Sequence, residues 1–383
     1  MLKYDEVKRV HVELSSACNA ACPSCPRNAD GGYTISWLKI RTMSLSEYKK
    51  IFTYDVCNQL EDILMCGNFG DPAYCKDLPD IVRYTGETNP NIKITVHTNG
   101  GIRPPKWWSD LAKTYNNLSV VFSIDGLEDT NHIYRRKVVW GRVMENAQAF
   151  NDAGGVSIWE YLIFQHNQHQ LDQARNLSEE MNFDEIKFKR PFGFETVSGN
   201  YESIRVLKDT GEFDYSIYPA DEKNHRNKNF GDTSIDRYGN NLSLYPDDFE
   251  KSLLNNTQHY EKIFKKEALR YKEQDENEIS CMTKNNGEVY IDSAGKVHPC
   301  CFLSVGSQNV NLAFDSLQYF KWLENNLTED QNNAILYPLE DIINSGFLSK
   351  IEQTWSKTHE EGRMMCCTQM CSKNKSAKDK LYI

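Results

Sequence analysis

The chain has 383 residues, with 44 lysines and arginines against 54 aspartates and glutamates, and a formal net charge of −10. This length allows a large core in one or two domains without cross-links, and the acidic balance argues against nucleic acid as the main partner. Since no apolar run could span a bilayer and the N-terminus lacks a signal-peptide core, we expect a cytoplasmic protein with no membrane partner. In that compartment, 12 cysteines indicate metal or thiol chemistry rather than disulfides.

Six short runs of β-branched and apolar residues dominate the first half of the chain. They alternate with amphipathic stretches, which is typical of βα units with parallel strands. The predicted strands cover residues 9–15, 60–66, 91–97, 118–124, 156–164 and 184–190. The pattern therefore predicts an α/β fold.

Helices are expected between these strands. The predicted helices cover residues 46–56, 77–86, 105–115, 140–153 and 168–181. Ser46 is the expected N-cap of the first helix, and Pro105 falls where a first turn tolerates proline. Gly154-Gly155 should end the helix over 140–153 with a left-handed cap.

The composition changes near residue 195. The stretch 196–280 is polar and contains no cysteine, and we interpret it as a linking region. Within it, residues 247–274 predict a long charged helix with acidic residues first and basic residues last, as the helix dipole favours. The predicted organisation is a first domain over 1–195, this linking region, and a last domain over 281–383.

Cys18, Cys22 and Cys25 follow the first predicted strand with the spacing C-x3-C-x2-C. Three thiolates can hold three corners of a four-iron cube and leave the fourth iron open. A structural zinc site would need a fourth closed ligand, and none lies at finger-like spacing. The spacing favours an iron–sulfur cluster with one open iron.

This motif, placed after the first strand of a βα fold, resembles the radical S-adenosylmethionine (SAM) superfamily. The resemblance implies a partial (β/α)6 barrel with a [4Fe–4S] cluster on the three cysteines. It also implies that SAM chelates the open iron through its amino and carboxylate groups. One electron, from a donor such as flavodoxin or ferredoxin, would then cleave SAM to a 5′-deoxyadenosyl radical that removes a hydrogen atom from a substrate.

The ends of later strands carry further resemblance to this superfamily. The superfamily's Gly-x-Gly-Glu-Pro turn is similar to Gly67-Asn68-Phe69-Gly70-Asp71-Pro72, where Asp stands in place of Glu. Its Thr-Asn-Gly turn is similar to Thr98-Asn99-Gly100, and its Ser-x-Asp-Gly turn is similar to Ser123-Ile124-Asp125-Gly126. Each of these is also an ordinary turn sequence. By resemblance, the SAM contacts would be Gly67, Gly70, Asp71, Asn99, Ser123, Arg135, Arg136 and Asn167. The sequence does not separate the roles of Arg135 and Arg136.

A second group of cysteines follows residue 280. A predicted β-hairpin around Ser293-Ala294-Gly295 lies between Cys281 and the pair Cys300-Cys301. The pair Cys366-Cys367 and then Cys371 complete the group. This arrangement resembles the SPASM and shorter twitch domains, and implies a small α+β domain with an auxiliary [4Fe–4S] cluster.

By that resemblance, the auxiliary ligands are Cys281, Cys300, Cys367 and Cys371, with Cys301 and Cys366 as alternates. A zinc ribbon on the same cysteines is the competing interpretation, because tetrahedral thiolate sites suit zinc equally well.

We expect a radical SAM enzyme acting on a small polar substrate, because the first predicted strand begins at residue 9 and leaves no room for a leader-binding domain. The alternatives are a peptide-modifying radical SAM enzyme and, in a different class, a non-catalytic iron–sulfur or zinc protein. The sequence assigns no catalytic acid or base.

Overall fold

The computed structural model describes residues 2–36, 38–191, 194–196, 199–200, 203–221, 271–308, 314–328 and 330–372, together with 261, 264, 265, 268 and 269. The long helix predicted over 247–274 lies largely outside these residues. Its last part, Lys272–Gln274, forms a 3-10 turn, η6.

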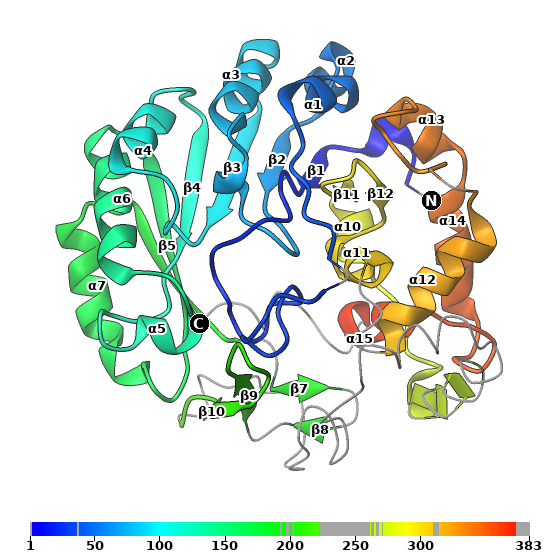
Figure 1. Cartoon of the computed structure of the whole chain (residues 1–383). Helices are drawn as coiled ribbons and strands as arrows, with labels where there is room; N and C mark the ends of the chain where they lie inside the picture. The colour runs from blue at the N-terminus through cyan, green and yellow to red at the C-terminus, as the bar shows by residue number, and fades with distance from the viewer. Residues whose placement is uncertain are drawn as a thin grey trace.

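One sheet organises the fold, with the strand order β12-β11-β1-β2-β3-β4-β5-β6 (Figure 1). From β1 to β6, each strand pairs in parallel with the next in chain order. These strands are β1 (Arg9–Val12), β2 (Asp62–Met65), β3 (Lys93–Thr98), β4 (Leu118–Ser123), β5 (Val156–Leu162) and β6 (Glu185–Lys189). The six predicted strands and the α/β class are therefore confirmed.

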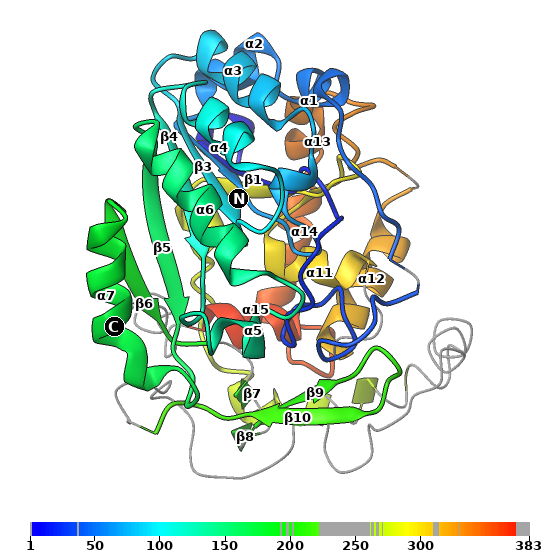
Figure 2. The same cartoon turned by 60° about the vertical axis from the view of Figure 1, so that its left-hand side comes forward.

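Helices between the strands cover one face of this sheet (Figure 2). They are α1 (Leu45–Ile51), α2 (Tyr54–Gln59), α3 (Leu78–Thr88), α4 (Pro105–Ala112), α5 (Asn131–Tyr134), α6 (Trp140–Asp152) and α7 (Leu171–Glu180), with the 3-10 turns η1 (Tyr4–Glu6), η2 (Pro72–Tyr74) and η3 (Gln168–Gln170). The predicted helices over 77–86, 105–115, 140–153 and 168–181 correspond to α3, α4, α6 and α7. As expected, Pro105 opens α4, and Gly154 follows α6 with a positive φ of 84°.

The prediction for the first helix is wrong in two respects. Ser44, not Ser46, is the N-cap of α1: its hydroxyl accepts from the Glu47 amide at 3.3 Å, and Glu47 accepts from the Ser44 amide at 2.9 Å. This reciprocal capping box satisfies two N–H groups at once. The helix then ends at Ile51, and Thr53 caps a second helix, α2. The two caps divide the expected single helix.

The second half of the chain adds to the same sheet. The predicted hairpin forms as β11 (Glu288–Ile291) and β12 (Val297–His298), with Gly295 in its turn at φ 82°. Unexpectedly, β11 pairs in parallel with β1. The remaining elements are β7 (Glu195–Thr196), β8 (Gly199–Asn200), β9 (Ile204–Leu207), β10 (Phe213–Ile217), α10 (Met282–Asn285), α11 (Cys301–Gln308), α12 (Phe314–Asn326), α13 (Leu339–Asn344), α14 (Phe347–Glu352), η7 (Gln353–Ser356) and α15 (Met365–Cys371).

The two faces of the sheet differ in chemistry. The helix-covered face is apolar and fully buried, as the side chains of Val96, Phe122 and Trp159 illustrate. The opposite face mixes apolar side chains, such as Val121 and Ile158, with half-buried polar ones. The polar side chains are Thr95, His97, Ser123, Glu160, Lys187 and Lys189. A closed βα barrel normally fills its interior with bulky branched residues. Here that interior face carries several half-buried polar side chains instead.

In the described part of the chain, none of the helices combines the length and apolar character needed to cross a bilayer.

Glu13 ties the end of β1 to the loop after β2. Its fully buried carboxylate accepts from the amides of Phe69 and Gly70, at 2.7 and 3.1 Å. Burial, opposed by these two amides and by the Tyr290 hydroxyl, raises the pKa of Glu13 to about 7. Its other oxygen, Oε2, completes no hydrogen bond of good geometry in the described residues.

This pKa predicts how stability should vary with pH. Between pH 4.5 and about 7, the native Glu13 carboxyl holds a proton that the unfolded chain releases, so the free energy of unfolding falls as pH rises. Glu13→Gln removes this dependence. Between pH 4.5 and pH 8, the free energy of unfolding of the variant should therefore rise by on the order of 3 kcal/mol relative to that of the wild type. Urea unfolding of both proteins at the two pH values measures it. If the difference in unfolding free energy between the two proteins is the same at both pH values, Glu13 has the same pKa in the folded and unfolded chain.

Candidate radical SAM site and second cysteine group

The loop after β1 carries the first group of cysteines, all of which are free thiols that are buried or half-buried. Arg27 holds the base of this loop. Its guanidinium donates to the carbonyl oxygens of Ser16 at 2.7 Å and of Phe69 at 2.9 Å. Both contacts are to backbone, so the loop is attached to the ends of β1 and β2 by the protein itself.

Two of these thiols meet polar side chains from other strand ends. Asn99 Nδ2, just after β3, lies 3.5 Å from Cys18 Sγ. Arg135 Nη1, at the end of α5, lies 3.7 Å from Cys22 Sγ. The structure thus places an amide and a guanidinium beside the cysteines.

The third thiol, Cys25, lies 3.9 Å from the carbonyl oxygen of Asn68 in the loop after β2. Burial raises the pKa of Cys25 to about 12, and the neighbouring Cys22 adds to the shift. Burial likewise raises the pKa values of Cys18 and Cys22. Thiolates in such surroundings need a positive partner, and metal binding supplies one as it releases the protons.

This donor set fits the cluster that the spacing predicts, because a four-iron cube takes one cysteine per iron. In the described residues, no three His, Cys, Asp or Glu side chains stand close enough together to hold a single metal ion. A cube does not require that arrangement, since each thiolate binds its own iron.

The loop after β2 can be formed only with glycine at two positions. A Cβ on Gly70 would lie 1.9 Å from the carbonyl oxygen of Ser15, and one on Gly67 would lie 2.4 Å from that of Gly70. The backbone therefore passes very close to the end of β1. Both residues are half-buried, which leaves backbone groups accessible beside the cysteines.

Asp71 is a buried positioning group. Its carboxylate accepts from the Asn99 amide and from Asn99 Nδ2, both at 2.8 Å, and from Thr98 Oγ1 and the Ala73 amide, both at 2.9 Å. Burial raises the pKa of Asp71, and these hydrogen bonds oppose the rise. With its oxygens occupied in this way, Asp71 orients Asn99 toward Cys18.

Ser123 is the last residue of β4 and lies half-buried on the polar face. Two residues later, the buried Asp125 carboxylate accepts from the Leu162 amide at 2.6 Å and pairs with Arg135 Nε at 2.5 Å. Asp125 thereby links the ends of β4 and β5 and holds the guanidinium that faces Cys22.

The structure separates the two neighbouring arginines. Arg135 faces Cys22 and Asp125. Arg136 instead pairs with Asp214 of β10 at 2.9 Å. Arg135 is therefore the one of the two that lies beside the first cysteine group.

Asn167 is not brought to the open face. It is fully buried, and its Nδ2 donates to the carbonyl oxygens of Asp125 and Leu162, both at 2.9 Å, while its Oδ1 accepts from the Phe164 amide at 2.7 Å. Its amide group supports the turn after β5.

In the second cysteine group, Cys281 and Cys371 come together from positions 90 residues apart in the sequence. They share a hydrogen bond, which lowers the pKa of Cys281 and raises that of Cys371. The Cys371 carbonyl oxygen also accepts from the Ser280 amide at 2.7 Å. This backbone contact fixes the two chain segments against each other.

Cys300 and Cys367 lie with this pair. Burial is the main cause that raises the pKa of Cys367, and the neighbouring Cys300 and Cys281 thiols raise it further. On helix α15, Cys367 and Cys371 are four residues apart and therefore share one face. Cys300 also packs against the small apolar cluster that contains Cys367.

The adjacent Cys301 is close enough to Cys300 to raise the pKa of that thiol. Apart from burial, the groups that raise the pKa of Cys301 are Glu288 and Cys66, on the polar face of the sheet. Its carbonyl oxygen accepts from Asn68 Nδ2 at 2.9 Å, which connects the two cysteine regions. Cys366 is half-buried at the edge of the small apolar cluster around Tyr319 and Leu303.

Sequence reasoning missed Glu13, Arg27 and Asn68 as supports of the site. A weak signal existed for Glu13, since an acidic residue directly after an apolar strand and close to a cysteine motif is unusual in a buried position. Nothing local marks Arg27 or Asn68, because their partners are backbone groups distant in sequence.

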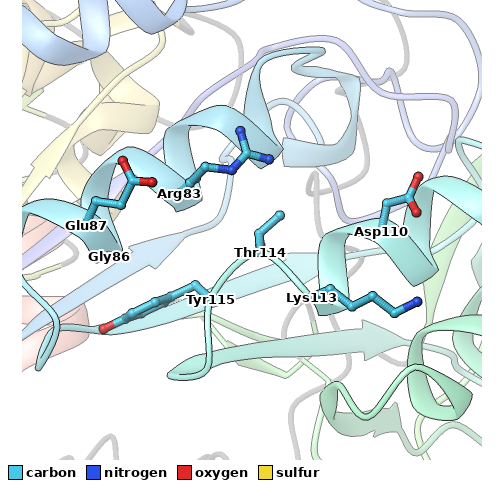
Figure 3. A pocket seen from close by; sticks show the side chains of 7 residues that line it. All are labelled: Arg83, Gly86, Glu87, Asp110, Lys113, Thr114 and Tyr115. Carbon is cyan, nitrogen blue, oxygen red and sulfur yellow. The ribbon is translucent and has the colours of Figure 1, made fainter.

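A surface hollow lies away from this site (Figure 3). It lies between α3 and α4 and is lined by Arg83, Gly86, Glu87, Asp110, Lys113, Thr114 and Tyr115. These residues belong to the second half of each helix and the turn after α4, at the end of the sheet where the strands begin. Active sites of βα barrels lie at the opposite end.

Comparison with known proteins gives one family match. Residues 12–178 match the model of the Radical SAM superfamily. No curated protein matches the chain.

Solved structures with a similar fold include three that were determined with SAM. SuiB from Streptococcus suis is 15% identical, with 92% of this chain and 71% of that chain covered and a TM-score of 0.49. The protein titled anSMEcpe is 15% identical, and the comparison covers 98% of this chain and 89% of that chain with a TM-score of 0.48. BtrN, in complex also with 2-DOIA, is 13% identical, covering 98% of both chains, with a TM-score of 0.40. Likeness at this level carries no information about substrate.

The family match covers the segment from β1 to α7, which contains the three cysteines and the strand ends around them. The family implies SAM and one [4Fe–4S] cluster as cofactors. The match to the Radical SAM superfamily therefore rests on residues 12–178.

Proposed function

We propose that this chain is a radical SAM enzyme, with a [4Fe–4S] cluster on Cys18, Cys22 and Cys25. When bound, the cluster and SAM would supply reductive cleavage to a 5′-deoxyadenosyl radical for hydrogen abstraction. The observation that carries the proposal is the convergence of Asn99 and Arg135 on the cysteine loop.

The protein's own residues bind and orient SAM in this proposal. The guanidinium of Arg135, held by Asp125, would pair with the methionine carboxylate of SAM. The backbone around Gly67 and Gly70 would accept from its amino group. Asp71 keeps Asn99 in place, and Ser123 would contact the ribose or the carboxylate.

We further propose a small polar substrate. The supporting observation is the polar face of the sheet, where Glu160 pairs with Lys189 and lies 3.8 Å from His97. Burial lowers the pKa of His97, which keeps the imidazole neutral and able to donate or accept a hydrogen bond. A peptide with a polar side chain would meet the same groups, so a peptide-modifying enzyme is the second candidate. Substrate-dependent release of 5′-deoxyadenosine distinguishes them.

An auxiliary [4Fe–4S] cluster on Cys281, Cys300, Cys367 and Cys371, in a twitch-type domain over 281–383, completes the proposal. The proximity of these four thiols supports it. The auxiliary cluster would accept an electron from the substrate or bind the substrate, and a small electron-transfer protein such as flavodoxin or ferredoxin would serve the first cluster.

The first test concerns the first cluster. Anaerobic reconstitution should give about eight irons per chain, and the triple change of Cys18, Cys22 and Cys25 to Ala about four, because one four-iron cube is lost. The triple variant should also form no 5′-deoxyadenosine from SAM after dithionite reduction. Iron and sulfide analysis and chromatography measure both.

The control is Cys57→Ala, which removes a lone buried thiol and should keep about eight irons. Stoichiometric zinc without iron in anaerobically purified protein, together with no SAM binding, would instead establish the non-catalytic alternative.

A second test uses the two adjacent cysteine pairs. Cys300→Ala and Cys367→Ala should each retain about four irons and still release 5′-deoxyadenosine, because the first cluster keeps its own thiols. Cys301→Ala and Cys366→Ala are the matched controls and should keep about eight irons. The opposite result within a pair would reverse the ligand assignment there. Unchanged iron in all four variants would contradict an auxiliary cluster.

A further inference from the structure

Residues 203–221, which we call the strap, consist of the β9–β10 hairpin and the segment after it. In both views the hairpin lies beyond the ends of the parallel strands, near α5 (Figures 1 and 2). Its composition led us to assign this stretch to a linking region. Its inner side is not linker-like, since Ile204, Val206 and Ile217 are at most 1% exposed and belong to the main core.

The strap contacts the cysteine loop directly. The Leu207 amide donates to the carbonyl oxygen of Asp30 at 2.9 Å, and Arg205 pairs with the Asp30 carboxylate at 3.1 Å. The backbones also approach closely: a Cβ on Gly32 would lie 2.6 Å from the carbonyl oxygen of Lys208. Only four residues separate Cys25 from Asp30 along the loop, so the strap braces the segment that carries the thiols.

A second contact is centred on Arg136. Its guanidinium pairs with Asp214 at 2.9 Å and lies over the ring of Tyr215, 5.4 Å from the centroid. The Tyr215 hydroxyl donates to the carbonyl oxygen of Ile133 at 2.6 Å. The carbonyl oxygen of Arg136 in turn accepts from the Ala21 amide at 2.9 Å, within the cysteine motif. Arg136 therefore connects the strap, the end of α5 and the cysteine loop.

A third contact lies beyond β5. Phe164 and Pro219 form a β-bridge, the Gln165 amide donates to the Tyr218 carbonyl oxygen at 3.1 Å, and the side chain of Gln168 donates to Asp221 at 2.6 Å. The strap is thus attached at the cysteine loop, at α5 and after β5. These are the regions around the site of the radical SAM domain.

We propose that the strap is a structural part of the SAM site and acts as a clamp. Through Arg136 it holds the neighbouring Arg135 toward Cys22 and Asp125, and through Asp30 it holds the cysteine loop. Arg136 and Asp214 are then positioning residues for SAM binding, although neither contacts SAM. This inference rests on the proposed function.

The test measures SAM affinity of the full-length, anaerobically reconstituted protein by calorimetry. Asp214→Ala and Arg136→Ala should each weaken SAM binding about five- to tenfold, the lower end of coupling between connected sites. The double variant should bind SAM no more weakly than the single variant with the lower affinity, because each single change already removes the same ion pair. Asp214→Glu, which keeps the charge, should restore most of the affinity. Iron content should stay that of the wild type.

The matched control is the ion pair between Lys137 and Asp209, which also joins α5's end to the strap but is exposed, with 47% and 65% of the side chains accessible. Such pairs contribute little. Lys137→Ala and Asp209→Ala should leave SAM affinity within about twofold of the wild type. If they weaken SAM binding as much as Asp214→Ala does, loss of any surface charge lowers the affinity, and the proposal that the strap acts as a clamp is wrong.

Hydrogen exchange separates failure of the clamp from failure of the proposed function. In Asp214→Ala, amides of residues 19–32 and 131–137 should exchange faster even without SAM. If the wild type binds no SAM but exchange changes in this way, the clamp stands and the proposed function fails. If the wild type binds SAM while Asp214→Ala changes neither exchange nor affinity, the clamp is overturned. The same holds if Arg136→Ala alone weakens binding, because Arg136 would then act without the strap.

Discussion

The parallel pairing of β1 with β11 is the constraint on which the rest of the molecule depends. β1 leads into the loop with the first cysteines, and the β11–β12 hairpin leads to Cys300. The register of this pairing, with Arg9 opposite Glu288, sets the strand that leads into the first cysteine group beside the hairpin that leads to the second. The second half of the chain thereby extends the sheet of the first half.

Buried carboxylates complete the arrangement at the ends of the strands. Glu13, Asp71 and Asp125 each accept backbone amides from a neighbouring unit, so each joins two strand ends. Loops at this edge would otherwise leave amides unsatisfied away from water. Asp71 and Asp125 also orient Asn99 and Arg135 beside the thiols, which links the stability of the edge to the chemistry proposed for it.

The face of the sheet opposite the helices carries polar and charged side chains that a substrate could contact. Half-buried charges on this face are paired, as Glu160 is with Lys189 across strands and Lys187 is with Glu185 within β6, which lowers the cost of their burial. A substrate with hydrogen-bonding groups could replace part of this pairing, whereas an apolar one could not. The strap lies at the neighbouring edge and connects the cysteine loop to α5 and to the turn after β5.

The sequence by itself determined what depends on neighbours along the chain. The periodicity of apolar residues located the six parallel strands and four of the five helices, and cysteine spacing identified the loop that the family match includes. Only the tertiary structure decided which of two adjacent residues faces a site. Arg135 rather than Arg136 meets Cys22, and Cys300 rather than Cys301 packs against the apolar cluster that contains Cys367. Adjacent side chains have the same local pattern but point in different directions, and their partners come from segments up to hundreds of residues away. For the same reason, the pairing of β11 with β1 and the packing of the strap left no signal in the local sequence.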